Sequence, residues 1–215
     1  MKLRSLFALA LAALLVPAAA SAAPAKTAAS AKAAKTAAAP TTSTSTPFDQ
    51  LTVGGFVGYE TDDVSGISLR LDGEIPFQAL TPQINMSWVG SIGYSHLTDD
   101  RGFGFDFTSN VLKIVPAARF TVPVNPQVSI FGDAGLGIAY VSAKLSPPAG
   151  FEAYGLSDSS LNIMMRIGAG AWFQVNPQLK IGAMLEFDPI FGDYGISGVS
   201  SQSTFLIQGG AMFKI

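Results

Sequence analysis

The feature that most constrains this chain is an alternation of apolar and polar residues that recurs eight times between residues 48 and 215. A period of two is typical of β-strands, because successive side chains of a strand point to opposite faces of the sheet. We therefore predict an all-β fold. The first and last apolar residues of each run place the eight strands at 51–59, 67–71, 84–94, 112–122, 128–140, 161–173, 179–187 and 205–215.

The two faces of the predicted strands differ sharply in chemistry. One face is apolar in every strand, whereas the other consists mostly of Gly, Ser, Asn, Thr and Ala. All charges within the strands fall on this second face when the strands are phased in this way. These charged residues are Arg70, Asp72, Glu74, Lys113, Arg119, Asp133, Arg166, Lys180, Glu186 and Lys214.

Composition indicates which face is outside. Only 13% of the residues are charged, against about 25% in ordinary soluble domains. A soluble barrel would expose the glycine- and serine-rich face, which is a poor solubilising surface. A sheet inside a bilayer must close on itself, so that no backbone group is left unpaired. We therefore predict an eight-stranded antiparallel up-and-down transmembrane β-barrel over 48–215, with its apolar face toward lipid.

The interior of an eight-stranded barrel is narrow and is normally filled by side chains. Charges of both signs occur on the inward face, and buried charges need opposite partners. We predict a structural salt-bridge network in the lumen, and a narrow or gated conducting path is the alternative. The predicted network comprises Arg70, Asp72, Glu74, Arg119, Asp133, Arg166, Lys180 and Glu186.

Pro116 lies inside the predicted strand 112–122. Because proline has no N–H to donate to a neighbouring strand, we expect a bulge or locally weakened pairing there.

The first 47 residues form two segments of different composition. Lys2 and Arg4 precede a short apolar stretch and an Ala-Ser-Ala cleavage pattern, so 1–22 is predicted to be a secretory signal peptide. Residues 23–47 are rich in Ala, Thr, Lys and Pro and contain no acidic residue. Nothing in this segment can bury enough apolar surface to order it, so we predict a disordered, flexible spacer.

Three predicted connections share one phrase, Thr-Pro-Gln or Asn-Pro-Gln, at 81–83, 125–127 and 176–178. The locked φ of proline favours short turns. Longer loops are expected on the opposite rim, at about 60–66, 95–107, 142–160 and 188–203. Since short turns of outer-membrane barrels are periplasmic and long loops extracellular, both chain ends and the spacer would be periplasmic.

On the Pro-Gln turns and the glycine-studded strands that follow them, such as 128–140, the chain resembles the small eight-stranded outer-membrane barrels of Gram-negative bacteria. This family includes the membrane domain of outer-membrane protein A and outer-membrane protein X. The resemblance implies an integral protein of the cell outer membrane, in contact with lipid and lipopolysaccharide. The final strand, 203–215, is similar to the family's C-terminal assembly signal, which implies the barrel-assembly machinery as a partner. The family usually ends in an aromatic residue, whereas Lys214 and Ile215 follow Phe213 here.

Some enzymes of this barrel class use a Ser and a His at the outer rim, so Ser95 and His96 need attention. Adjacent strand residues point to opposite faces, so Ser95 should face the lumen and His96 should point outward or into the loop. No third catalytic group accompanies them. With a single His and no Cys in the chain, we predict no catalytic, cofactor-binding or metal-binding residue.

The predicted long loops are acidic, with only Arg101 and Lys144 as bases. An acidic rim disfavours nucleic acid as a partner. Solvated loops are the simplest interpretation; divalent cations bridging to lipopolysaccharide phosphates, or a basic partner protein, are alternatives. The loop aromatics fit an interfacial girdle, and a binding surface is the alternative. The acids are Glu60, Asp62, Asp63, Asp99, Asp100, Asp106, Glu152, Asp158, Asp188 and Asp193, and the aromatics are Phe103, Phe105, Phe151, Tyr154, Phe191 and Tyr194.

These features predict a non-enzymatic outer-membrane barrel. It would act as a structural or anchor protein of the envelope, or as the barrel subunit of a surface or envelope-spanning assembly with an envelope or extracellular protein partner. The alternative is a narrow channel or carrier for ions or small hydrophobic solutes. A lipid-modifying enzyme is the least favoured hypothesis.

Overall fold

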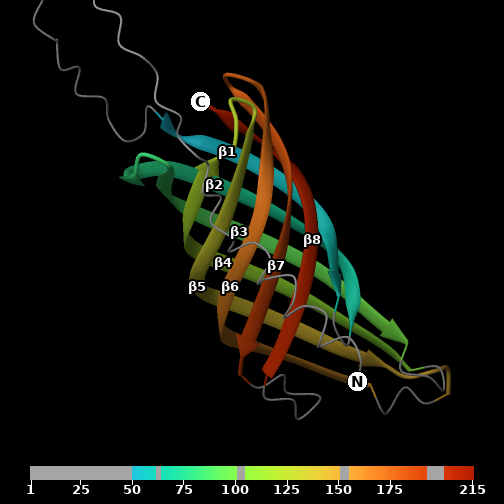
Figure 1. Ribbon diagram of the computed structural model, residues 1–215. Coiled ribbons are helices and arrows are strands. Elements are labelled where there is room, and N and C mark those ends of the chain that lie inside the picture. The colour runs from blue at the N-terminus through green and yellow to red at the C-terminus, as the bar shows by residue number, and fades with distance from the viewer. Residues whose placement is uncertain (1–49, 62–63, 101–104, 151–154, 193–200) are drawn as a thin grey trace, which may run out of the picture. The chain divides into compact units, whose positions relative to one another are not determined.

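The computed structural model describes residues 50–61, 64–100, 105–150, 155–192 and 201–215. Eight antiparallel strands form a closed barrel in which each strand pairs with the next and the last pairs with the first (Figure 1). The predicted all-β, up-and-down barrel is therefore confirmed. The strands are β1 (Thr52–Thr61), β2 (Ser65–Thr81), β3 (Ile84–Asp100), β4 (Asp106–Pro123), β5 (Val128–Ser146), β6 (Leu156–Asn176), β7 (Leu179–Phe191) and β8 (Ser201–Lys214).

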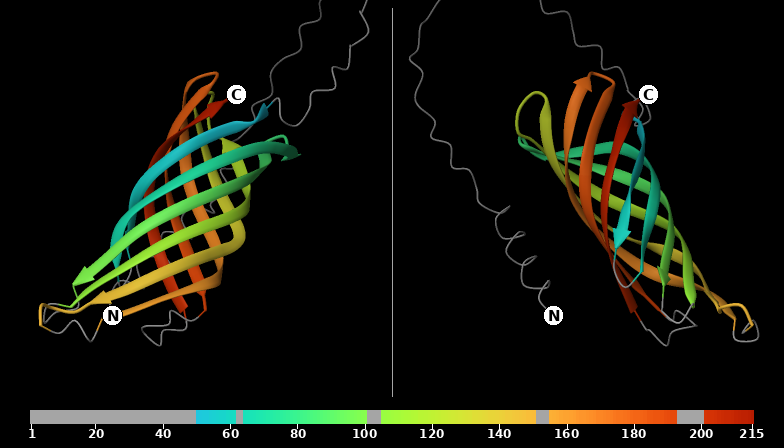
Figure 2. Two further views of the ribbon diagram at one scale, coloured as in Figure 1. Left: turned by 180° about the vertical axis from the view of Figure 1, so that it is seen from behind. Right: turned by 90° about the vertical axis from the view of Figure 1, so that its right-hand side faces the viewer.

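Closure is made by β1, which pairs with β2 on one side and with β8 on the other. The β1–β8 register runs from Thr52 opposite Lys214 to Thr61 opposite Phe205 without a shift. The strands incline to the barrel axis, as Figure 2 shows from two sides, and such a tilt is needed to close an eight-stranded sheet. Along the span that all eight strands share, every strand is paired on both sides, which is the condition for a sheet in hydrocarbon. At one end, β2 continues to Thr81, beyond Glu74, the last residue that it pairs with β1 there.

The predicted faces are also confirmed. Large apolar side chains of the apolar face are exposed on the outside of the barrel; Leu71 is 66% exposed and Leu136 66%. Charged side chains of the other face are buried inside; Arg119 is 0% exposed. This inversion of the usual soluble arrangement fits a barrel whose exterior contacts lipid.

The three repeated turns share one hydrogen-bonding device. The side-chain oxygen of Thr81, Asn125 or Asn176 accepts hydrogen bonds from the backbone N–H groups two and three residues later, at 2.8–3.2 Å. Proline occupies the position after each of these residues and presets its φ. These turns, with the two ends of the barrel at Leu51 and Ile215, define what we call the turn rim; the opposite end is the loop rim.

Pro116 weakens strand pairing on one side only. Its pairing with Gly90 of β3 is intact, whereas the pairing of β4 with β5 is interrupted between Ile114 and Ala117 without a change of register. The locally weakened pairing expected there is thus confirmed, without a bulge. Pro189 of β7 does the same toward β6, where pairing is interrupted between Phe187 and Ile190.

The longer loops contain fewer residues than predicted, because the strands beside them continue further. β3 continues to Asp100, β4 begins at Asp106, β6 begins at Leu156 and β7 continues to Phe191. Asp99, Asp100, Asp106 and Asp158 therefore belong to strand ends rather than to loops, as does Phe191. The predicted signal peptide and spacer lie outside the described residues, as do Asp62, Asp63, Arg101, Phe103, Phe151, Glu152, Tyr154, Asp193 and Tyr194.

The exposed apolar face generates a depth-dependent prediction. Leu136→Arg places a charge near the middle of β5 and should lower the free energy of unfolding by about 2–4 kcal/mol. Val175→Arg, on the same face beside the turn rim, should cost only about 0–1 kcal/mol. Urea unfolding in lipid vesicles measures both values. Equal costs at the two positions would contradict a lipid-facing exterior.

Candidate functional site: the charged lumen

The structure brings the predicted luminal charges into one network. Arg70, Asp72, Glu74, Arg119, Asp133, Arg166 and Glu186 are buried in the lumen, and the side chain of Lys180 is 20% exposed. Each of the eight makes at least one ion pair with another member. These residues are brought together as expected from their shared strand face.

Arg119 is the centre of the network. Its Nε and Nη2 atoms donate to the two carboxylate oxygens of Asp133, both at 2.7 Å. This bidentate geometry follows from the register, because the two residues lie directly opposite each other on β4 and β5. The guanidinium also donates to Glu74 at 3.0 Å and to Asp72 at 3.2 Å. One cation thus bridges three carboxylates from β2 and β5, two strands that are not adjacent in the sheet.

Arg70 extends the network across the lumen. It lies two residues before Asp72 on the same face of β2, and its Nε and Nη2 atoms donate to that carboxylate at 2.6 and 2.5 Å. Its Nη1 atom pairs with Glu186 of β7. Asp133 lies 3.6 Å from Arg70, so Asp72 and Asp133 each contact two arginines.

A second tier lies closer to the loop rim. Lys113 donates to Glu60 at 2.8 Å and to Asp188 at 3.2 Å. Arg166 joins this tier to the first, because its Nε atom lies 3.4 Å from Glu186 and 3.3 Å from Asp188.

The assignment of Glu60 and Asp188 to exposed loops was wrong. Both are 0% exposed, because β1 continues to Thr61 and β7 to Phe191. The alternation of strand faces could have revealed this, because Glu60 lies two residues after Gly58 on the luminal face and Asp188 lies two residues after Glu186. Lys113 was placed on the correct face but omitted from the network.

The charges of the lumen nearly cancel. Five bases face six acids within the described lumen: Arg70, Lys113, Arg119, Arg166 and Lys180 against Glu60, Asp72, Glu74, Asp133, Glu186 and Asp188. Desolvating a charge is costly unless an opposite charge and hydrogen bonds compensate it. The shared carboxylates supply this compensation, and they make the network sensitive to the loss of any one cation.

Apolar clusters fill the lumen on both sides of the charges. Toward the loop rim, Val64, Leu97, Val111, Val115, Ala139, Val141, Met164 and Ile190 form a buried cluster. Toward the turn rim, Phe56, Phe131, Trp172, Met184 and Met212 form another. The alternation missed Val111 and Val115 because both faces of β4 are apolar around Lys113.

The aromatic cluster also supports the cations. The ring of Phe131 stacks on Trp172 with a centroid distance of 5.0 Å. The Arg119 guanidinium carbon lies 4.7 Å from the Phe131 centroid, and Lys180 Nζ lies 4.9 Å from that of Trp172. Cation–π attraction is strongest in a desolvated setting such as this one.

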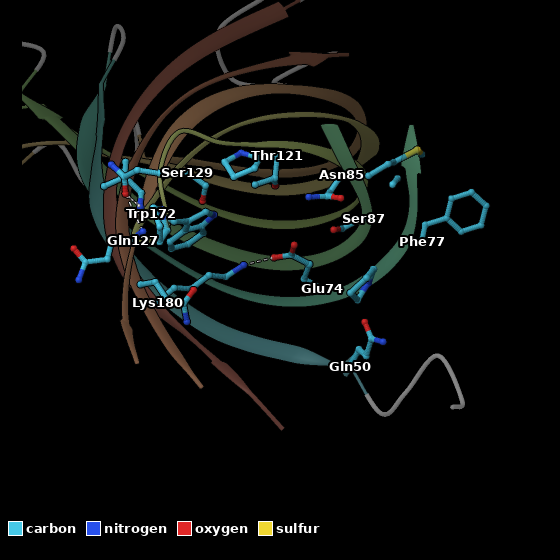
Figure 3. Close-up of a pocket in the computed structure, with 18 of the residues that line it drawn as sticks. Gln50, Glu74, Phe77, Asn85, Ser87, Thr121, Gln127, Ser129, Trp172 and Lys180 are labelled. Carbon is cyan, nitrogen blue, oxygen red and sulfur yellow. Dashed lines mark hydrogen bonds and ion pairs between the residues drawn. The ribbon is translucent and has the colours of Figure 1, made fainter. Parts of the chain in front are cut away.

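The lumen opens at the turn rim into a cavity of about 680 Å³, which we call the vestibule (Figure 3). The ion pair between Lys180 and Glu74, at 3.0 Å, crosses its inner end. Trp172 contributes to the same wall. The remaining lining is rich in amide and hydroxyl side chains from the three hairpins β2–β3, β4–β5 and β6–β7, including Gln78, Asn85, Ser87, Thr121, Gln127, Ser129 and Gln174.

Ser95 and His96 point to opposite faces, as predicted. Ser95 is buried in the lumen, where it donates to Glu60 and lies 3.2 Å from Ser68. His96 is exposed, and its Nδ1 atom lies 2.8 Å from Asn110 Oδ1, which also accepts from Tyr94 at 2.7 Å. The two side chains therefore do not form a catalytic pair.

Within the described residues, no group of three His, Cys, Asp or Glu side chains could hold a metal ion. Over the same residues, no helix is both long and apolar enough to cross a bilayer.

The central arginine generates a stability prediction. Arg119→Met leaves three buried carboxylates short of a cation, and should lower the free energy of unfolding by about 3–5 kcal/mol. Lys144→Met removes an exposed cation near the loop rim and should change it by less than about 0.5 kcal/mol. Urea unfolding in vesicles compares the two variants. A loss below about 1 kcal/mol for Arg119→Met would refute the central role of this residue.

Comparison with known proteins places this architecture in a family. The family model described as "Outer membrane protein beta-barrel domain" matches residues 6–194. No curated protein sequence matches the chain.

Several solved structures are similar. Neisserial surface protein A is 12% identical, with 77% of this chain and 96% of that chain covered and a TM-score of 0.51. Ail, the attachment invasion locus protein of Yersinia pestis, is 17% identical, with 77% and 97% covered and a TM-score of 0.47. The outer membrane enzyme PagL is 18% identical, with 76% and 99% covered and a TM-score of 0.48. At such identities the likeness concerns the fold.

The family match spans most of the chain, and the barrel has an apolar exterior and a charged interior. The chain therefore belongs to the outer membrane protein beta-barrel domain family and is an integral protein of the Gram-negative outer membrane.

Proposed function

We propose that this protein is a non-enzymatic structural barrel, which anchors or stabilises the envelope or forms the barrel subunit of a surface or envelope-spanning assembly. The observation that carries this proposal is the filled lumen. Between the vestibule and the loop rim lie an aromatic cluster, two tiers of ion pairs and an apolar cluster.

A filled lumen favours anchorage over transport. A hydrated ion would have to pass Arg119 and Arg166, which are 0% and 1% exposed and are held by carboxylates from several strands. It would then meet buried side chains such as Leu97 and Met164, both 0% exposed. Breaking buried pairs is costly, so these layers support a rigid barrel.

The proposal also includes an orientation of the barrel in the outer membrane. Short turns are periplasmic in outer-membrane barrels, so the turn rim, both chain ends and the spacer 23–47 would face the periplasm after removal of residues 1–22. Insertion through the barrel-assembly machinery would use β8. The exposed Tyr59, Tyr94 and Tyr140 fit an interfacial girdle near lipopolysaccharide.

Enzymatic activity is not part of the proposal. The only histidine lies on the outside of the barrel, where its Nδ1 atom is 2.8 Å from Asn110 Oδ1, while Ser95 is enclosed in the lumen. Lipid-modifying chemistry needs a nucleophile and a base within reach of each other.

Conductance tests the filled lumen. The purified protein in planar bilayers should give no current steps above leak, because the ion-pair tiers and the apolar cluster obstruct the lumen. A large-bore porin measured in the same bilayer confirms that steps are detectable. Reproducible current steps whose size changes in Arg119→Met or Arg166→Met would contradict the anchor proposal and support the channel alternative.

Labelling tests the orientation. The chain contains no cysteine, so Gln83→Cys on the turn rim and Ala149→Cys on the loop rim each introduce a unique, exposed thiol. In intact cells a membrane-impermeant maleimide should label only Ala149→Cys. Permeabilised cells should show labelling of both variants. Labelling of Gln83→Cys in intact cells would reverse the proposed orientation.

A further inference from the structure

We propose that a groove on the outside of the barrel binds one acyl chain of a lipid A molecule of the outer leaflet. The groove crosses β8, β1, β2 and β3, which are consecutive in the ring (Figure 1). It has a volume of about 520 Å³ and is lined mainly by apolar residues of the lipid-facing side. The choice of lipid rests on the orientation proposed above, whereas the groove itself does not.

Two glycines at the bottom of the groove have no explanation within the barrel. At Gly54 and Gly210, on the luminal face, a Cβ atom would lie only 2.4 and 2.3 Å from a backbone oxygen of the adjacent strand, so packing requires glycine there. At Gly55 and Gly209, on the outer face, the nearest atoms would be 3.6 and 3.8 Å away, which is ordinary contact. Neither outer glycine has a positive φ, and β1 pairs with β2 and with β8 without a bulge.

These glycines leave an open space between projecting side chains. Leu71 lies directly opposite Gly55 and is 66% exposed, and Ile92 lies opposite Leu71 and is 56% exposed. Glycine weakens the interior of a strand, and it often marks a position that a ligand or another backbone approaches closely. The hollow therefore indicates that something outside the barrel occupies it.

The groove extends obliquely from the middle of the apolar band to its polar edge. Gly209, Val57, Leu69 and Tyr94 form one row of directly paired residues from β8 to β3. Gly209 is central in the apolar stretch 205–213, whereas Tyr94 ends the apolar stretch of β3. The row covers three inter-strand spacings, about 14 Å, which is close to half of the hydrocarbon thickness of about 30 Å. An acyl chain follows the same course, from its headgroup to the centre of the bilayer.

Polar side chains lie at the outer end of the groove. Tyr94 Oη donates to Asn110 Oδ1 at 2.7 Å, and His96 Nδ1 lies 2.8 Å from the same oxygen. Tyrosine is enriched at membrane interfaces, and such side chains can hydrogen-bond to a sugar headgroup. This end points to the loop rim, which is extracellular in the proposed orientation. Lipid A combines a sugar headgroup with acyl chains and belongs to that leaflet.

A lipid chain fits the groove better than a second barrel does. The groove is continuous with the apolar exterior, which already contacts lipid. With a width of about 14 Å and a similar length it offers on the order of 200 Å², whereas a stable protein interface buries about 800 Å² on each partner. The hollow is therefore of the right scale for a chain and too small for a dimer contact by itself.

Native mass spectrometry of the full-length protein in detergent tests the groove. The wild-type barrel should retain one copy of added lipid A. Gly55→Leu combined with Gly209→Leu fills the groove and should lower the retained fraction at least about tenfold, because several methylene contacts are lost. The control Gly132→Leu changes a lipid-facing glycine of β5 at which a Cβ also has space. It should leave retention unchanged.

Leu71→Ala provides a second test that does not depend on the filled variant. It removes an exposed wall of the groove and should also lower retention, and urea unfolding verifies that each variant is folded.

Four results would overturn the proposal. The absence of retained lipid A on the wild type, or equal retention after the groove is filled, would remove the site. A wild-type dimer that the filled variant loses would assign the groove to a second copy of the chain. Stronger retention of phosphatidylethanolamine than of lipid A would reject the choice of lipid. None of these results concerns conductance or thiol labelling, so a failure of the groove is distinguishable from a failure of the structural proposal.

Discussion

Backbone hydrogen bonding is the constraint from which the rest of this structure follows. Hydrocarbon offers no partner for a peptide N–H or C=O, so a sheet can cross it only as a closed ring. Eight strands satisfy that requirement when β1 pairs with β8 as well as with β2. Closure at this strand number also fixes a narrow interior. The side chains of the lumen must therefore fill this narrow space, whatever function they serve.

The chain fills that interior in layers. Arginine and lysine side chains reach across the lumen to carboxylates on other strands, while branched and aromatic side chains seal the space on either side. The cost of burying charge is offset because the carboxylates Asp72, Asp133 and Asp188 each contact two cations. Rigidity and closure are properties suited to an anchor, and they leave the vestibule as the accessible part of the interior.

The alternation of side chains between the two faces of each strand made the fold and most of the network predictable from the sequence. The phase of each strand assigns Arg119 or Glu186 to the lumen without knowledge of any contact, and closure then brings such residues together. This alternation could not show how far a strand continues, so Glu60 and Asp188 were assigned to loops. It also could not recognise luminal residues such as Val111 and Val115, because apolar neighbours on the lipid face remove the alternation. The vestibule depends on side chains from three hairpins, and no local pattern encodes it.

The capped turns of the turn rim have a consequence for how the molecule is assembled. In each turn, a side chain at most three residues away accepts hydrogen bonds from the backbone N–H groups. The hairpins β2–β3, β4–β5 and β6–β7 can therefore each form locally, starting from the turn. Local contacts of this kind carry a small loop-closure entropy. The seam between β1 and β8 joins the most distant segments of the sheet and has no turn to guide it. It is the natural last step, and the point at which an unfinished barrel would still be open.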